Sequence, residues 1–73
     1  MKVTYSTAIK KLRLKMCLTQ TEFGQLFHVT FGTVNRWESG KFAPTMKIKR
    51  MLIPYFEKYN INVEENVHDQ STN

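Results

Sequence analysis

The sequence lacks the features of a membrane, disulfide-stabilised or metal-binding protein. No apolar run approaches the length of a membrane span, and Met1 and Lys2 are not followed by a signal-peptide core. The one cysteine, Cys17, cannot form an internal disulfide, and neither it nor the two histidines have a metal-ligand spacing. We therefore expect a soluble, cytoplasmic protein without metal or cofactor. Cys17 is expected to be a semi-buried helix-end residue, with a redox-sensing thiol as the alternative.

Catalytic motifs are equally scarce. The chain has no glycine-rich phosphate loop, no paired catalytic carboxylates and no nucleophile with a neighbouring base. We therefore expect no enzymatic activity and assign no catalytic residue. A chain of 73 residues has room for one domain, whose single core supplies only about 3 to 5 kcal/mol.

Acidic residues are few, and their distribution divides the chain. Residues 1–61 hold all eleven Lys and Arg residues against three Glu residues, a balance of +8, whereas residues 62–73 carry −3. We predict a domain over residues 1–61 and a flexible, polar, acidic tail over residues 62–73, which has no hydrophobic periodicity. The basic excess attracts phosphate groups of any sequence, although a merely solvated surface is the simpler alternative.

Two short amphipathic helices are predicted within residues 18–41. The first begins after Thr19, an N-cap residue that forms a capping box with Glu22. Its apolar side gathers Phe23, Leu26 and Phe27. The short spacing to the second helix predicts a tight turn between the two.

The second helix begins after Thr30 and ends at the stop signal formed by Ser39 and Gly40. Val34 and Trp37 share its buried face. The opposite side carries small and polar residues, namely Gly32, Thr33, Asn35 and Arg36, with Phe31 at its edge. Such a surface is suited to contact a polar, anionic partner.

Two longer helical patterns flank this pair. The first, capped by Thr4 or Ser6, has an apolar stripe of Tyr5, Ile9, Leu12 and Met16, and the second, after Thr45, has one of Ile48, Leu52, Phe56 and Tyr59. Pro54 interrupts the second pattern and should kink the helix or divide it into two segments. The sequence therefore predicts an all-α fold of four to five helices.

Turn, caps and core positions together form a recognisable pattern over roughly residues 5 to 60. Its residues are Leu12-Arg13, Leu18-Thr19-Gln20, Phe23, Leu26, Val29-Thr30, Thr33-Val34, Arg36-Trp37-Glu38, Gly40-Lys41 and Pro44. This pattern resembles the lambda-repressor-like (Cro/repressor, XRE-type) helix-turn-helix family. Cys17 and His28 stand where the family usually has glycines at left-handed turns, and Gly24 replaces the usual alanine.

The resemblance implies a small lambda-repressor-like domain that acts as a sequence-specific DNA-binding transcriptional regulator of prokaryotic or phage type. Helix 31–38 would read the major groove of double-stranded DNA. The family's ion pair would join Arg13 to Glu38, His28 would be a turn residue near the DNA backbone, and Phe42 is expected in the core. The expected DNA-binding residues are Gln20, Thr30, Phe31, Gly32, Thr33, Asn35, Arg36, Ser39, Lys41 and Lys47.

Two other functions fit the same pattern. One is a protein-interaction module, such as an antitoxin or a transcription adaptor, which would more often show a large apolar patch in place of a short polar face. The other is the detached recognition domain of a DNA-modifying enzyme. The sequence leaves open whether the protein acts as a homodimer.

Overall fold

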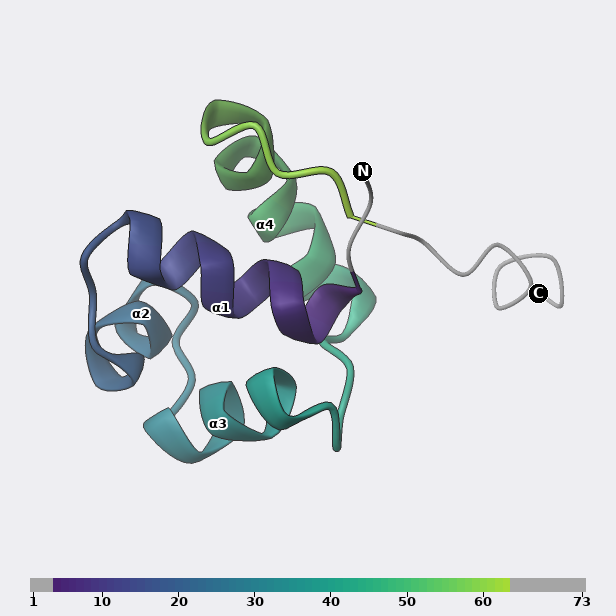
Figure 1. The fold of residues 1–73 in the computed structure, drawn as a ribbon. Helices are drawn as coiled ribbons and strands as arrows, with labels where there is room; N and C mark the ends of the chain where they lie inside the picture. Colours follow the sequence, from purple (N-terminus) through teal and green to yellow (C-terminus); the bar gives the residue numbers. More distant parts are fainter. Residues whose placement is uncertain (1–3, 64–73) are drawn as a thin grey trace, which may run out of the picture.

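The computed structural model describes residues 4–63, which form four α-helices. They are α1 (Tyr5–Lys15), α2 (Gln20–Leu26), α3 (Phe31–Ser39) and α4 (Met46–Lys58). α1 packs against both α3 and α4, while α2 packs against α3. Figure 1 shows α2 and α3 together below α1, with α4 behind α1 and rising above it. The predicted small all-α domain is confirmed, with four helices.

The helices share one apolar core, which the predicted stripes largely supply. Its buried residues are Ala8, Ile9, Leu12, Phe23, Phe27, Val34, Trp37, Ile48, Leu52, Phe56 and Ile61. Aromatic side chains connect the helices, since Tyr5 of α1 meets Phe56 of α4 with ring centroids 6.1 Å apart. Phe27 meets Tyr55 in the same edge-on manner at 5.6 Å. Such pairs add about 0.5 to 1.5 kcal/mol to the burial of the rings themselves.

α4 runs through Pro54 as a single helix, so the alternative in which Pro54 divides it is wrong. A proline lacks the N–H that would donate to the carbonyl four residues earlier, here that of Arg50. Both residues are exposed, and water can therefore satisfy the freed carbonyl.

Three side chains are more exposed than the sequence predicted. Leu26 is exposed because α2 ends at this residue and the chain turns to bury Phe27 instead. Cys17 is exposed because it lies in the turn after α1. Phe42 is 61 % exposed, since the link from α3 to α4 buries Pro44 and leaves the phenyl ring at the surface. The predictions of an interior Leu26 and Phe42 and a semi-buried Cys17 are wrong.

The turns have the backbone that the sequence predicted. Cys17 and His28 adopt left-handed conformations, with φ of 60° and 61°. Gly24 permits a close approach of α2 to the following turn, because a Cβ at this position would lie 2.5 Å from the Val29 carbonyl oxygen. The helix pair is therefore compact, and the start of α3 is fixed relative to α2.

The packed region extends slightly beyond residue 61. Val63 is partly buried against the core, two residues past the predicted domain boundary. The rest of the predicted acidic tail, residues 64–73, lies outside the described residues.

Candidate nucleic-acid interface

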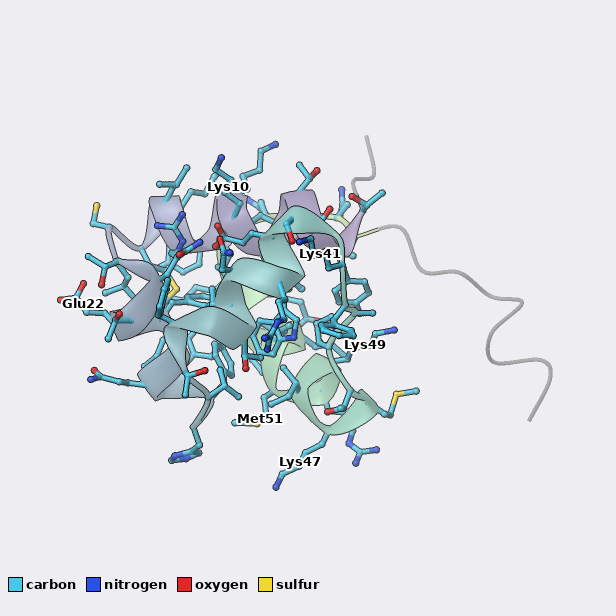
Figure 2. All side chains as sticks on the ribbon, turned by 90° about the horizontal axis from the view of Figure 1, so that it is seen from below. Lys10, Glu22, Lys41, Lys47, Lys49 and Met51 are labelled. Atoms are coloured by element: carbon cyan, nitrogen blue, oxygen red, sulfur yellow. The ribbon has the colours of Figure 1, made fainter. Side chains whose placement is uncertain are left out.

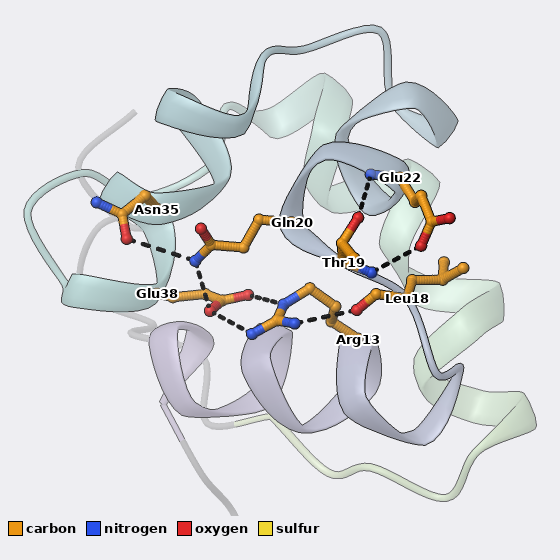
Figure 3. Close-up of polar contacts among 7 residues, drawn as sticks. All are labelled: Arg13, Leu18, Thr19, Gln20, Glu22, Asn35 and Glu38. Carbon is orange, nitrogen blue, oxygen red and sulfur yellow. Dashed lines mark hydrogen bonds and ion pairs between the residues drawn. The ribbon is translucent and has the colours of Figure 1, made fainter.

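The N-termini of α2 and α3 are capped as the sequence predicted. The Glu22 amide donates to Thr19 Oγ1 over 3.1 Å, and Thr19 N–H donates back to Glu22 Oε1 over 2.9 Å, which completes the capping box (Figure 3). At α3, Thr30 Oγ1 accepts the Thr33 N–H over 3.4 Å. These bonds satisfy amides that a helix start leaves unpaired, and they fix the first turn of α3.

An ion pair joins α1 to the end of α3. Arg13 Nε donates to Glu38 Oε2 over 2.7 Å and Nη2 donates to Oε1 over 3.1 Å, while Nη1 donates to the Leu18 carbonyl over 3.0 Å (Figure 3). The side chains are only 13 % and 6 % exposed. The hydrogen bond to Glu38 raises the pKa of Arg13 above its ordinary value. The predicted structural pair is therefore present, and Arg13 is charged throughout the neutral range.

Gln20 extends this network across α2 and α3. Its Nε2 group donates to Glu38 Oε1 over 3.1 Å and to Asn35 Oδ1 over 3.4 Å (Figure 3). Both N–H donors of the side-chain amide are thus directed within the protein, and its oxygen is left as an acceptor. Phosphate offers only acceptors, so in this arrangement the Gln20 side chain has no donor for it.

The outward face of α3 presents the other predicted residues of that helix. Phe31 is 57 % exposed, Asn35 and Arg36 are exposed, and Gly32 and Thr33 are partly covered. Within residues 4–63, the Arg36 guanidinium has no ion-pair or hydrogen-bond partner, and it lies over the Phe42 ring, 5.7 Å from the centroid. Arg36 therefore offers its N–H groups to an external acceptor.

Two predicted residues close the C-terminal end of α3. The Ser39 hydroxyl donates to the Arg36 carbonyl over 3.1 Å, and the Lys41 amide donates to the same oxygen over 3.0 Å. Gly40, with φ of 82°, supplies the left-handed residue that this turn requires. Ser39 thus uses its single donor internally, whereas the Lys41 side chain is exposed.

Figure 2 views the molecule with α3 toward the reader. Lys10 and Lys41 lie on one side of the face in this view and Lys47 on the opposite side, with Glu22 at the start of α2. Lys49, near the Lys41 side, is partly buried, with its ammonium 4.7 Å from the Tyr5 ring centroid. Lysines from α1, the α3–α4 link and α4 thus border a face that itself carries Arg36. Lys10 was not among the predicted residues. It lies in α1, far from α3 in the sequence, so the sequence alone did not indicate that it borders this face.

Comparison with family models identifies the fold. A model described as helix-turn-helix matches residues 9–48, more than half of the chain. The chain belongs to the XRE-type, lambda-repressor-like helix-turn-helix family. Domains of this family bind DNA and regulate transcription, so the protein is in general terms a DNA-binding helix-turn-helix regulator. A comparison with curated proteins found no match, and a comparison with solved structures found none either.

The helix-turn-helix unit itself corresponds to α2, the turn at His28 and α3. Of the ten predicted DNA-binding residues, seven belong to α3 or its two ends, and Gln20, Lys41 and Lys47 flank it. Besides Lys10, the sequence also did not connect Phe42 with them, although its ring lies beneath the Arg36 guanidinium. The glycine stop signal at Gly40 was the available clue, because a left-handed C-terminus turns the chain back toward the last turn of the helix.

Two further observations concern the described part of the chain. None of its helices has the length and apolarity that crossing a bilayer requires. Its His, Cys, Asp and Glu side chains form no group of three or more that is placed to hold a metal ion.

Proposed function

We propose that this helix-turn-helix regulator recognises a specific DNA sequence, as transcription factors of prokaryotic and phage type do, with α3 in the major groove. The observation that carries the proposal is the exposed Arg36 on the outward face of α3, whose guanidinium has no acceptor within residues 4–63. An arginine in this position can donate two parallel hydrogen bonds to guanine O6 and N7, worth about 1 to 3 kcal/mol of discrimination.

The remaining side chains of α3 have complementary tasks. The N-terminal part of a recognition helix contacts the base edges, and the helix before it crosses the backbone. Phe31 offers an exposed apolar surface to a thymine methyl group. Apart from its chain neighbours and the backbone of its own helix, Gly32 has only Thr30 Oγ1 within 4 Å of the position that a Cβ would occupy, which leaves room for the DNA to approach the backbone. Asn35 accepts from Gln20 through Oδ1, so its amide nitrogen can donate to a base acceptor.

The bordering residues position the domain on phosphates. Lys41 and Lys47 are exposed and carry mobile ammonium donors suited to this contact. Ser39 would have to rotate its hydroxyl away from the Arg36 carbonyl before it could donate to a phosphate. Gln20 acts mainly through its oxygen, as an acceptor for a base donor or a bridging water, because its amide nitrogen is bound to Glu38 and Asn35.

Selection of binding sites from randomised double-stranded oligonucleotides tests the proposal. An enriched site is expected, and a two-fold symmetric site would indicate that two copies of the chain bind together. Arg36→Ala should then relax discrimination at one base pair per half-site by about 1 to 3 kcal/mol on a panel of single-base variants, with the fold unchanged.

Lys41→Ala is the matched control for loss of a positive charge. It should weaken binding to all sequences about equally and reduce the slope of log affinity against log salt by roughly one unit. If Arg36→Ala instead weakens all sequences equally, Arg36 is a phosphate contact and the base-reading role is refuted.

A protein-interaction module is the second candidate function. It is favoured by the exposure of large apolar side chains, since Phe31, Phe42 and Met46 are 57 %, 61 % and 53 % exposed. Exposed apolar surface is typical of sites that bind other proteins. This function would be supported if the selection enriches no DNA site and Arg36→Ala changes binding to no sequence.

A further inference from the structure

Phe42 is the most exposed of the large apolar side chains in the described part of the chain, and it contacts the residue proposed to read DNA. Its side chain is 61 % exposed, yet its ring lies 5.7 Å below the guanidinium carbon of Arg36. A phenyl ring left in water is unfavourable, whereas a ring that supports a cation is partly compensated by the attraction between them. The pairing therefore gives a physical reason for an aromatic residue at this surface position.

Backbone hydrogen bonds within residues 36–42 hold Phe42 next to Arg36. α3 ends in a turn in which the Gly40 amide donates to the Trp37 carbonyl over 3.2 Å and the Lys41 amide to the Arg36 carbonyl over 3.0 Å. This is the Schellman arrangement, and it requires the left-handed conformation of Gly40. The Phe42 amide also approaches the Arg36 carbonyl, at 3.4 Å. Phe42 is thus held beside Arg36 by backbone hydrogen bonds.

The geometry leaves the useful part of Arg36 free. The five N–H donors of a guanidinium point outward in its plane, so a ring that lies over its face leaves them free to bind other groups. None of these donors is bound by a group within residues 4–63. A side chain that is already ordered loses less conformational entropy when it binds, which favours affinity and fixes the direction of its hydrogen bonds.

We propose that Phe42 is a positioning residue for sequence recognition, which holds the Arg36 guanidinium at the end of α3 with its donors directed at a base pair. The proposal rests on the base-reading role of Arg36 given above. It extends the recognition surface to a residue outside the helix-turn-helix itself. Because Phe42 acts through Arg36, its substitution should change discrimination only at the base pair that Arg36 contacts.

The first test uses the full chain without DNA. Protons held over a phenyl face resonate upfield, so the side-chain NMR signals of Arg36 should move downfield toward ordinary arginine values in Phe42→Leu, and remain upfield in Phe42→Trp. Phe31→Leu is the matched control, because it makes the same change at a similarly exposed residue of α3. Arg36 signals that are unchanged by Phe42→Leu would overturn the proposal, whatever the protein binds.

The second test uses the selected DNA site and its single-base variants. Phe42→Leu should lower discrimination about two- to fivefold at the base pair that Arg36→Ala affects, and nowhere else, which corresponds to the strength of an exposed cation–π contact. Phe42→Trp should preserve discrimination, because tryptophan offers the strongest ring face. Thermal unfolding should be nearly unchanged, since Phe42 is exposed.

A double-mutant cycle separates this role from a direct DNA contact. In the Arg36→Ala background, Phe42→Leu should have no further effect on discrimination. An equal loss in both backgrounds, or a uniform loss on all sequences, would show that Phe42 contacts DNA independently and would overturn the proposal. Failure of Arg36→Ala itself to relax discrimination would refute the proposed base-reading function, and the NMR result would still report on the stacking.

Discussion

Replacing Arg13 with alanine removes two of the three hydrogen bonds that the Glu38 carboxylate accepts within residues 4–63. The remaining donor is Gln20 Nε2, at 3.1 Å from Oε1. Because the Glu38 side chain is only 6 % exposed, water can replace the lost guanidinium poorly. Removal of one partner from a buried ion pair costs about 3 to 5 kcal/mol, and the partial exposure of Arg13 places the expected loss near the lower figure. For a domain of this size, a loss of about 3 kcal/mol lowers the Tm by roughly 12 to 24 °C.

Unfolding can be followed through the single tryptophan, since Trp37 is only 4 % exposed. Arg50→Ala is the matched control, because Arg50 is an exposed arginine without a partner within residues 4–63, and its loss should cost less than about 0.5 kcal/mol. The pKa of Arg13 is raised in the folded protein. The stabilisation of the fold by its positive charge is therefore fully present below the pKa of the unfolded state, and it is lost only as the pH rises through the pKa of the folded state. The deficit of Arg13→Ala should therefore be the same at pH 7 and pH 9.

The double variant shows whether the loss comes from the pair. Replacing Arg13 and Glu38 together by methionine leaves no unpaired charge and should be much less destabilising than Arg13→Ala alone. The alanine variants of each residue and of both give the coupling energy. Strictly additive losses, or a Tm of Arg13→Ala within about 3 °C of the parent, would refute an energetically coupled pair.

Three substitutions to or from glycine test the backbone of the turns. Gly24→Ala should destabilise the domain by about 1 to 3 kcal/mol in urea unfolding, although alanine favours helix, because its Cβ would lie 2.5 Å from the Val29 carbonyl oxygen. Equal or higher stability would show that the turn relaxes at little cost. His28→Gly should stabilise by up to about 1 kcal/mol, since φ is 61° there, whereas Asn60→Gly, with φ of 58°, should change stability less because asparagine tolerates this conformation. Similar gains at both positions would contradict the role of side-chain identity.

The features that the sequence predicted correctly depend mostly on near neighbours in the chain. A threonine before a helix accepts an amide three residues on, so the caps at Thr19 and Thr30 needed no tertiary information. The stop at Gly40 is equally local. The link between Arg13 and Glu38, residues 25 apart, was predicted only through the family resemblance. Periodicity alone places each residue beside an apolar stripe, four residues after Ile9 and Val34, but it does not pair them.

The failures concern side chains whose surroundings are set by chain segments distant in sequence or by a helix end. Hydrophobicity predicted that Phe42 is buried, but the link that buries Pro44 leaves Phe42 outside. Leu26 lies on the predicted apolar side of α2, yet the helix ends there and Phe27 enters the core in its place. A hydrophobic pattern specifies a face, whereas exposure depends on whether another element covers that face.

The proposed DNA-binding residues fall into two groups, according to whether their hydrogen-bond donors are already used within the protein. Gln20 and Ser39 use their donors within the protein, so they support α3 before any DNA is bound. Arg36, Lys41 and Lys47 retain donors that no group within residues 4–63 accepts. Because DNA phosphates and guanine edges both offer acceptors, these three cations should supply most of the direct polar binding energy. Among these three cations, only Arg36 lies over an aromatic ring, which fixes the direction of its hydrogen bonds. Discrimination between bases should therefore depend on Arg36. The two lysines should contribute affinity for DNA of any sequence.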